Sequence, residues 1–482
     1  MKDNNDVVDL DKEADVLNQA EELSEHEKEI IKKYLLKADI RILPIIVLML
    51  MAALLDRGLI AATLVFGIQK GLKLTSTEEG NVTTFFYITY IICEAPANII
   101  LKKVKPHIWF SFIGIGFSIT QLVQAYAKNG TSLTLLRCLL GIFEAGVSPG
   151  IIGYLNYWYT RSEVSVRMAI FLSAGPVAGI IGAPFSAWIA NKKIGNNKPY
   201  QNIFQFSGII TLVVSVAAFF IIQDYPDTAK FLTPEERALV VRRLHLEQGL
   251  ASKTKGSISE AVKFLKDWKI YVFSIIFLGL SNSANILSLF TPTVAVSLGY
   301  TATQSSYIAM GGYATGFISM VAYILFLRKK PYWIMITIYS LLTAISYCIA
   351  IFAKGKILRV AFLIIAGFGS APVTPIAISW LSVNQGGVYK GMIATAIQLS
   401  VGALGGIISP RLYVRKYFPK FYGGSVFFIA SLGLSAFLSL MMTVYMRNEN
   451  KRRDENPEDV SNLSLAEQRK LYDKHPNFRY KY

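Results

Sequence analysis

Five ionisable residues, three acids and two arginines, interrupt the long apolar runs of this sequence. They are Asp56, Arg57, Glu94, Arg137 and Glu144. An ionisable side chain near the centre of a bilayer costs at least about 2.5–3.5 kcal/mol, so such residues are rare unless they serve a function. Carboxylates can bind protons and arginines can bind anions, and the set could combine these two chemistries.

The spacing of these residues places them at different depths along helices. Asp56 lies 12 residues after Pro44, or about 18 Å along a helix, which is close to mid-membrane. Glu144 follows Arg137 by seven residues, so the two lie on nearly the same helix face about 10 Å apart. A cation and a protonatable carboxyl group on one helix face suit the binding of an anion together with a proton. Glu94 lies deeper toward the cytoplasm and is better placed for a gate.

A second interpretation is that these charges only pair and hold helices together. Asp56 and Arg57 point about 100° apart on a helix, so each needs a partner on another helix. The second half of the chain has no Asp or Glu between Lys269 and Arg447, so coupling by carboxylates falls to the first half. Uncharged polar residues interrupt the spans there. Our candidate substrate contacts among them are Asn282 and Asn285.

The elements that must position these residues follow from composition. The chain has 482 residues, of which 53% are hydrophobic and 17% charged, whereas a soluble protein has about 25% charged residues. Its apolar residues form runs of about 20, the length that spans a bilayer. These features exclude a cytosolic enzyme, a secreted disulfide scaffold and a disordered chain. The net charge of +17 lies mainly between the runs, so no nucleic-acid groove is expected.

The apolar runs predict an all-α polytopic membrane protein with twelve transmembrane helices. The longest interruption divides them six and six, which is typical of a rocker-type secondary transporter. We expect a cytoplasmic arm (1–42), an N-terminal six-helix bundle (43–223), a cytoplasmic central loop (224–269), a C-terminal six-helix bundle (270–446) and a cytoplasmic tail (447–482). The predicted spans are 43–67, 80–101, 107–127, 132–157, 168–190, 203–223, 270–297, 304–327, 332–353, 360–383, 391–410 and 423–446. Lysine and arginine concentrate in the termini, the central loop and short loops of the same side, which predicts that both termini are cytoplasmic.

Short motifs follow one another along nearly the whole chain. They are Arg41-Ile-Leu-Pro44, Asp56-Arg57, Tyr90-x-x-x-Glu94-x-Pro96, Arg137-x-x-x-Gly141-x-x-Glu144, Trp158-Tyr159-x-Arg161-x-Glu163, Phe231 to Arg237, Leu298-Gly299-Tyr300, Trp380-x-x-x-Asn384 with Lys390, and Asn477-Phe478-Arg479-Tyr480. In this ordered set the chain resembles the anion:cation symporter branch of the major facilitator superfamily, and most closely the fungal allantoate permease family.

The resemblance implies a major facilitator fold and proton-coupled uptake of a small organic anion at the plasma membrane. Family substrates include allantoate, ureidosuccinate, nicotinate, pantothenate and biotin. In these relatives the matching residues couple protons to the anion. We therefore expect Asp56 and Glu144 to bind protons, and Arg137, aided by Arg57, to bind the carboxylate during alternating access.

Other features refine this expectation. Some anion-carrying relatives add an arginine in the seventh span, and its absence here favours a monocarboxylate with an uncharged polar tail over a dicarboxylate. In the eighth span Gly311-Gly312-Tyr313 stands where relatives tend to have proline. On the cytoplasmic side, we expect Glu94 with Arg161 or Arg167 to form a gate.

Other functions stay open at this point. A proton-coupled exporter of drugs or metabolites would suit the Gly- and Pro-rich fifth span, and an uncoupled facilitator is a further alternative. A substrate-sensing receptor would have little room for a signalling domain, and a membrane-embedded enzyme would need a His, Ser or metal constellation that the spans lack. We expect no metal and no cofactor except the proton as coupling ion. The expected partners are a small organic anion and the lipid bilayer, with a monomeric chain and no nucleic acid.

Overall fold

The computed structural model describes residues 24–101, 103–252, 263–327, 329–386, 388–418, 421–456, 460, 468 and 471–482. At several helical positions, Arg161 among them, the description covers the backbone only. Every regular element within these ranges is a helix.

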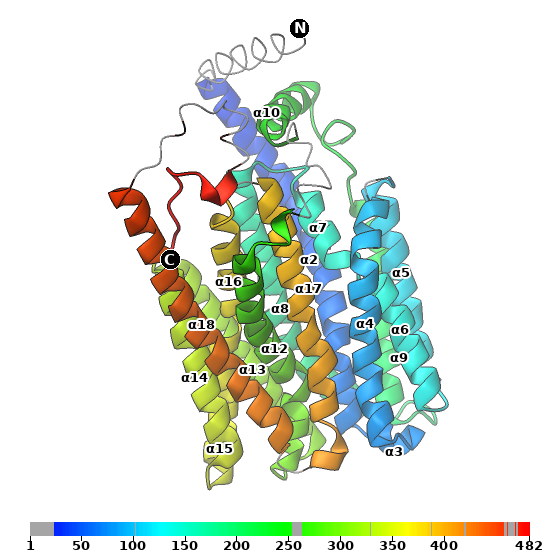
Figure 1. The fold of residues 1–482 in the computed structure, drawn as a ribbon. Coiled ribbons are helices and arrows are strands. Elements are labelled where there is room, and N and C mark those ends of the chain that lie inside the picture. The colour runs from blue at the N-terminus through cyan, green and yellow to red at the C-terminus, as the bar shows by residue number, and fades with distance from the viewer. Residues whose placement is uncertain are drawn as a thin grey trace.

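Long helices run side by side through the molecule (Figure 1). The helices of the first half, long and short, are α2 (Glu25–Val65), α3 (Ile68–Leu72), α4 (Ser76–Leu101), α5 (Pro106–Gln124), α6 (Gly130–Glu144), α7 (Val147–Leu155), α8 (Arg161–Ala190), α9 (Pro199–Ile221) and α10 (Pro234–Ser252). In the second half they are α12 (Trp268–Ser297), α13 (Ala302–Ala322), η1 (Tyr323–Leu327), α14 (Tyr332–Phe352), α15 (Lys356–Ser370), α16 (Val373–Val383), α17 (Val388–Leu412), η2 (Arg415–Tyr417), α18 (Tyr422–Glu455) and η3 (Tyr472–Lys474).

The helices account for the predicted number of spans. Eleven helical segments in the described ranges are long and apolar enough to cross a bilayer. Three of these segments join two helices: α6 with α7, α13 with η1, and α15 with α16. Helix α4, with 26 residues, runs beside them as the twelfth long helix (Figure 1). The prediction of an all-helical, polytopic fold is confirmed.

The first long helix begins earlier than the apolar pattern predicts. Helix α2 starts at Glu25 rather than near residue 43, because Ser24 caps it. The Ser24 hydroxyl accepts a hydrogen bond from the Glu27 amide, and the Glu27 carboxylate accepts one from the Ser24 amide at 3.0 Å. This capping box fixes a helix start inside the segment that we predicted to be an arm.

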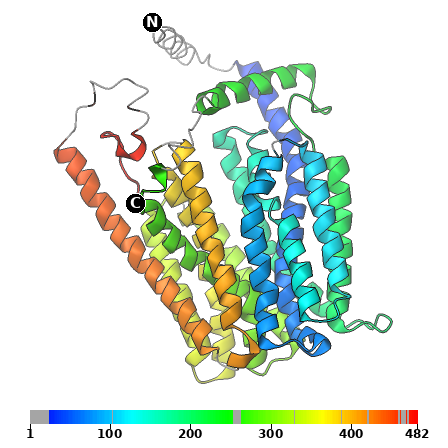
Figure 2. The same ribbon diagram turned by 45° about the vertical axis from the view of Figure 1, so that its right-hand side comes forward.

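The helices form two groups that meet along a central seam (Figure 2). Across the seam, α4 packs against α17 and α8 packs against α13. The start of α2, helix α10 and residues 471–482 all lie at one end of the molecule (Figure 1). Hydrogen bonds join the groups toward the opposite end, from Thr84 Oγ1 to the Ile407 carbonyl at 3.1 Å and from Asn191 Nδ2 to Thr303 Oγ1 at 3.0 Å. The seam is therefore fastened at the end that lies away from the termini.

Candidate functional site

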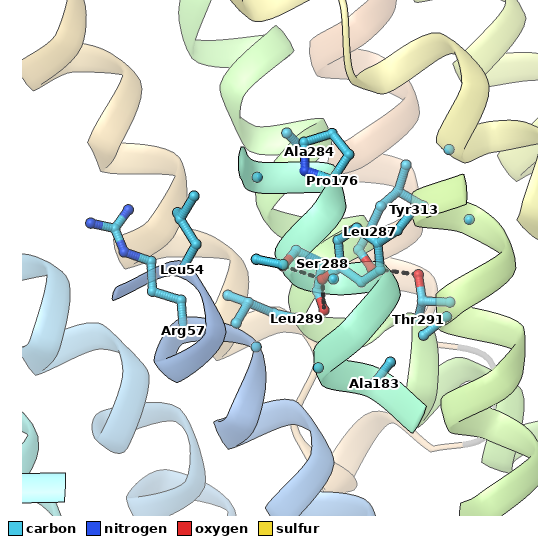
Figure 3. A pocket seen from close by; sticks show the side chains of 18 of the residues that line it. Leu54, Arg57, Pro176, Ala183, Ala284, Leu287, Ser288, Leu289, Thr291 and Tyr313 are labelled. Atoms are coloured by element: carbon cyan, nitrogen blue, oxygen red, sulfur yellow. Dashed lines mark hydrogen bonds between the residues drawn. The ribbon is translucent and has the colours of Figure 1, made fainter. Parts of the chain in front are cut away.

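A cavity of 310 Å³ lies in the seam between the two groups of helices. Residues of α2, α4, α8, α12, α13, α15 and α16 line it (Figure 3). Most of the lining is apolar or consists of small residues, and Arg57 is the one charged residue among the described residues that line it. The volume is at the lower end of small-molecule pockets, which range from about 300 to 1,000 Å³.

Two ion pairs lie beside this cavity and link α2 to α6. Arg57 Nε donates to Glu144 Oε1 at 2.5 Å, and Arg137 Nη1 donates to Asp56 Oδ2 at 3.2 Å. The Asp56, Arg137 and Glu144 side chains are at most 2% exposed, whereas Arg57 is 21% exposed because it reaches the cavity. The two adjacent residues of α2 thus each find a partner on another helix, as their 100° separation requires.

Arg57 is placed at the edge of the cavity by aromatic side chains as well as by Glu144. Its guanidinium carbon lies 4.7 Å from the centre of the Tyr90 ring and 5.8 Å from that of Phe86. The guanidinium is turned away from Tyr313, on the left of the view in Figure 3. Glu144 therefore binds the cation on the side away from the main space of the cavity.

Both carboxylates keep one oxygen that makes no protein hydrogen bond within the described residues. These atoms are Asp56 Oδ1 and Glu144 Oε2, and both are buried. A carboxylate oxygen without a partner can take up a proton without breaking an existing contact. Arg137 likewise leaves Nε and Nη2 without such a partner. The cluster is therefore buried, yet several of its polar atoms lack hydrogen-bond partners in the described part of the chain. Such atoms lower the stability of a protein, so a pair that served only to join helices would be expected to avoid them.

Gly141 allows α6, the helix that carries Arg137 and Glu144, to pack closely against α4. Gly141 lies on α6 between Arg137 and Glu144, and an added Cβ there would be 2.3 Å from Thr89 Oγ1 and 2.6 Å from the Phe86 carbonyl oxygen. No side chain fits in this space, so α4 and α6 can approach only because residue 141 is glycine.

Replacing Gly141 with alanine is expected to push α6 away from α4. Overpacking of this kind costs about 1–3 kcal/mol, and thermal unfolding of the purified protein would show it as a lower midpoint. Gly153→Ala is the control, because a Cβ at that exposed position of α7 meets no atom within 4 Å. An equal loss in both variants would contradict the role of the α4–α6 contact.

The predicted substrate contacts fall into two groups in the structure. Arg57 and Asn285 line the cavity, and Asn285 Oδ1 accepts a hydrogen bond from the Tyr87 hydroxyl at 3.2 Å. Arg137 and Asn282 are not among the lining residues. Asn282 is fully buried and donates through Nδ2 to Ser431 Oγ of α18 at 3.4 Å, so in this conformation it faces a neighbouring helix.

Arg167, one of the predicted gate residues, pairs with a residue that the sequence did not point to. Arg167 makes a two-pronged contact with Asp39 of α2, at 2.9 Å from Nε and 2.6 Å from Nη2. Glu94 is half-buried on α4, and the side chain of Arg161 lies outside the description. Asp39 gave no signal in the sequence, because it precedes the first predicted span.

Sequence reasoning also missed most of the uncharged polar lining. Tyr313 and Ser288 line the cavity and their hydroxyl oxygens lie 2.7 Å apart. Serine and tyrosine are common inside membrane helices, so neither residue stands out without knowledge of the face that it occupies.

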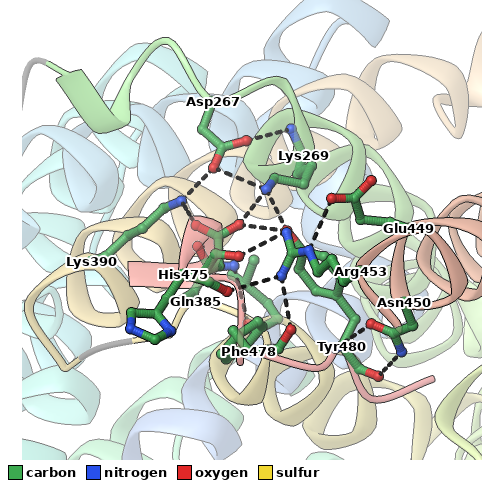
Figure 4. A network of polar contacts seen from close by, with 12 residues as sticks. Asp267, Lys269, Gln385, Lys390, Glu449, Asn450, Arg453, His475, Phe478 and Tyr480 are labelled. Carbon is green, nitrogen blue, oxygen red and sulfur yellow. Dashed lines mark hydrogen bonds and ion pairs between the residues drawn. The ribbon is translucent and has the colours of Figure 1, made fainter. Parts of the chain in front are cut away.

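A second polar cluster lies far from the cavity, where residues 471–482 dock on the C-terminal helices (Figure 4). The buried carboxylate of Asp473 pairs with Lys269 of α12 and, at 2.6 Å, with Lys390 of α17. Lys390 also pairs with Asp267. Burial raises the pKa of Asp473, but the two lysines outweigh burial and hold this pKa below its ordinary value.

Several motifs of the sequence meet at this cluster. Trp380 Nε1 and Asn384 Nδ2 both donate to the Lys481 carbonyl, at 2.9 and 2.8 Å, and Asn384 Oδ1 accepts from the Lys481 amide at 2.8 Å. The Tyr480 hydroxyl donates to the Asp473 carboxylate at 2.8 Å. Docking of the tail explains why these residue types occur at these positions.

Comparison with known proteins identifies the family. Residues 46–410 match the family profile described as Major Facilitator Superfamily. The chain belongs to this superfamily. This major facilitator protein is therefore a multi-pass membrane protein and a secondary transporter, not an enzyme.

Its relatives and structural neighbours are distant. An "Uncharacterized transporter" of Schizosaccharomyces pombe is 27% identical over 426 residues, covering 88% of this chain and 85% of that protein. A "Putative tartrate transporter" of Agrobacterium vitis is 28% identical over 422 residues, covering 85% and 91%. A bacterial homologue of the human lysosomal transporter Spinster, solved in an inward-facing and occupied conformation, superposes with a TM-score of 0.63 at 12% identity, covering 83% and 96%. This last likeness confirms the major facilitator fold.

Proposed function

We propose that this transporter takes up a small organic monocarboxylate together with protons, by alternating access, and that it belongs to the allantoate permease branch of the superfamily. The observation that supports this function is the Arg57–Glu144 pair at the edge of the cavity. A relative named as a tartrate transporter adds support for an organic anion.

Arg57 can serve either Glu144 or a substrate carboxylate, but not both at full strength. While Glu144 is ionised, it binds the guanidinium at 2.5 Å. A proton on Glu144 removes the buried negative charge and leaves Arg57 as an uncompensated cation beside the cavity, which is unfavourable in a low-dielectric interior. The carboxylate of the substrate then replaces Glu144 as the counter-ion. Proton and anion are therefore bound together and released together.

The second pair, Asp56 with Arg137, does not line the cavity, so in this conformation it can influence a bound anion only through its electric field. Asp56 is next to Arg57 on α2, and Arg137 lies two turns from Glu144 on α6, so a change in the charge of this pair alters the field at Glu144. We propose that Asp56 is a second proton acceptor and that Arg137 supports the anion through this field. Arg137 would contact the anion directly only after α6 moves relative to the cavity.

The charge of the cavity favours an acid with one carboxylate. Arg57 is its one charged lining residue in the described ranges, whereas a dicarboxylate such as tartrate would leave its second carboxylate without a cation. The remaining polar groups of the lining are hydroxyls and one amide, which suit an uncharged polar tail.

The positive-inside pattern supports a cytoplasmic location for the termini and for α10, which lies at the same end. We propose that in a plasma membrane the fastened end of the seam, with Thr84 and Asn191, faces outward and that the cavity is reached from the cytoplasm; the two hydrogen bonds across the seam at that end support this. We propose that the reverse state closes near Glu94 and the Arg167–Asp39 pair.

Uptake of labelled allantoate, ureidosuccinate, nicotinate, pantothenate and biotin tests this function in cells that express the chain. The assay compares external pH 5 with pH 7 and includes Glu144→Gln and Arg137→Ala. We expect uptake of at least one acid to rise at pH 5 and to be lost in both variants, because neither retains both ion pairs. Glu29→Gln, which removes an exposed carboxylate of α2, is the matched control and should leave uptake unchanged.

Two other outcomes would overturn the proposal in different ways. Uptake that ignores pH and survives both substitutions would indicate a facilitator whose charges only pair helices. Accumulation that falls when the chain is expressed, with efflux driven by external protons, would indicate an exporter.

A further inference from the structure

Tyr313 spans the cavity from α13 and contacts elements of both groups of helices. Its ring packs on Gly179 of α8, where an added Cβ would lie 2.3 Å from the ring. Its hydroxyl lies 2.7 Å from Ser288 Oγ of α12, and 4.0 Å from the position that a Cβ of Gly58 would take on α2. Because Gly58 follows Arg57 in the chain, the Tyr313 hydroxyl reaches the part of α2 that carries the cation.

Helix α12 presents two hydrogen-bonding positions to the cavity, one turn apart. Asn285 bonds to the Tyr87 hydroxyl and Ser288 bonds to Tyr313, and all four residues line the cavity. Residues three apart on a helix are separated by about 4.5 Å along its axis. Figure 3 shows Ser288 close to Tyr313, on the side of the cavity away from the Arg57 guanidinium.

We propose that the Ser288–Tyr313 hydroxyl pair is the specificity-determining site for the uncharged end of the substrate, selecting monocarboxylates that carry an amide-like group at the end remote from the carboxylate. This inference rests on the proposed function, since it assumes that Arg57 binds the carboxylate. It adds a second recognition point on the opposite bundle.

The chemistry of the pair supports an amide-like partner. Each hydroxyl can donate one hydrogen bond and accept others, so the pair can donate to a carbonyl oxygen and accept from an N–H group. Neither residue is charged, so a second carboxylate or an ammonium group would lose its hydration without gaining a counter-ion. A hydrocarbon end would leave the two hydroxyls in their existing contacts, with each other and with the Ser288 carbonyl, and would gain no new hydrogen bond.

Binding of two acids of the same shape tests the inference. Glutaramate (5-amino-5-oxopentanoate) and 5-methylhexanoate each have one carboxylate and nine non-hydrogen atoms, but only glutaramate ends in an amide. Thermal unfolding of the purified full chain at pH 5 with increasing amounts of each acid yields a Kd, because a ligand that binds the native state raises its stability. The readout is the ratio of the two Kd values.

We expect Tyr313→Phe and Ser288→Ala to reduce the preference for glutaramate by roughly two- to tenfold, the usual worth of one hydrogen bond. Tyr347→Phe is the matched control, since it removes a buried hydroxyl that bonds Tyr413 at 2.8 Å away from the cavity. It should leave the ratio unchanged. If Tyr313→Phe does not fold, Ser288→Ala gives the same information.

A ratio that does not change in either cavity variant, or that changes equally in Tyr347→Phe, would overturn the inference and leave the proposed function standing. If neither acid stabilises the wild-type chain at pH 5, the inference fails, because it predicts that glutaramate binds; uptake of the five labelled acids then decides the proposed function separately.

Discussion

Changing Arg57 to glutamine is expected to abolish uptake and to destabilise the protein. The substitution removes the cation of the cavity and leaves Glu144 buried without its partner at 2.5 Å. Breaking a buried ion pair in this way costs about 3–5 kcal/mol, which corresponds to a loss of roughly 10²- to 10⁴-fold if the substrate depends on the same contact. Uptake at pH 5 and the unfolding midpoint measure the two effects.

The double variant Arg57→Gln with Glu144→Gln separates these effects. Removing both charges leaves no unpaired ion, so we expect most of the lost stability to return while uptake stays absent. Arg452→Gln, which removes one partner of an exposed ion pair on α18, is the control and should change stability by at most about 1 kcal/mol. Uptake by the double variant at the wild-type rate would show that Arg57 and Glu144 serve only to join α2 and α6.

Changing Asp473 to asparagine is expected to detach the tail and destabilise the C-terminal bundle. The carboxylate is 1% exposed and pairs with both Lys269 and Lys390. Without it the two buried ammonium groups share Asp267 alone, at a cost of about 3–5 kcal/mol. A lower unfolding midpoint and faster proteolysis of residues 471–482 would show the loss.

The matched control for this prediction is Asp454→Asn. Asp454 pairs with Arg479 of the tail at 2.8 Å but is 65% exposed, so its loss should cost at most about 1 kcal/mol. Equal destabilisation by both substitutions would contradict the importance of the buried cluster.

The pH dependence of the tail follows from the lowered pKa of Asp473. A carboxyl group whose pKa is lower in the native state stabilises the fold above its unfolded pKa, about 3.9, and loses this effect as the pH falls through the native value. The tail should therefore stay docked at both pH 5 and pH 7. A pH effect on uptake in that range would then arise elsewhere, and Glu144 is the proposed source.

The residues of the ion pairs were predictable because a charge in an apolar run is visible in one sequence. Their partners were not, since pairing Asp56 with Arg137 and Arg57 with Glu144 depends on how α2 and α6 are placed relative to one another in the bundle. The close approach of α6 to α4 depends on Gly141, which a single sequence presents as one glycine among many.

The sequence also does not reveal which face of a helix lines the cavity. Asn282 and Asn285 are three residues apart on α12, yet one is buried against α18 and the other lines the cavity. The apolar pattern shows that a helix crosses the membrane but not which side of it meets the cavity, because all sides of such a helix can be apolar.

The two ion pairs together carry no net charge, since two arginines balance two carboxylates. If Glu144 alone takes up a proton when one monocarboxylate binds, the loaded carrier is still electrically neutral, and membrane voltage does no work on the uptake step. A second proton, on Asp56, would move one positive charge inward per cycle, and a voltage of 100 mV would then contribute about 2.3 kcal/mol to accumulation. Because the paired charges cancel, the dependence of uptake on membrane voltage would report how many protons cross with each anion.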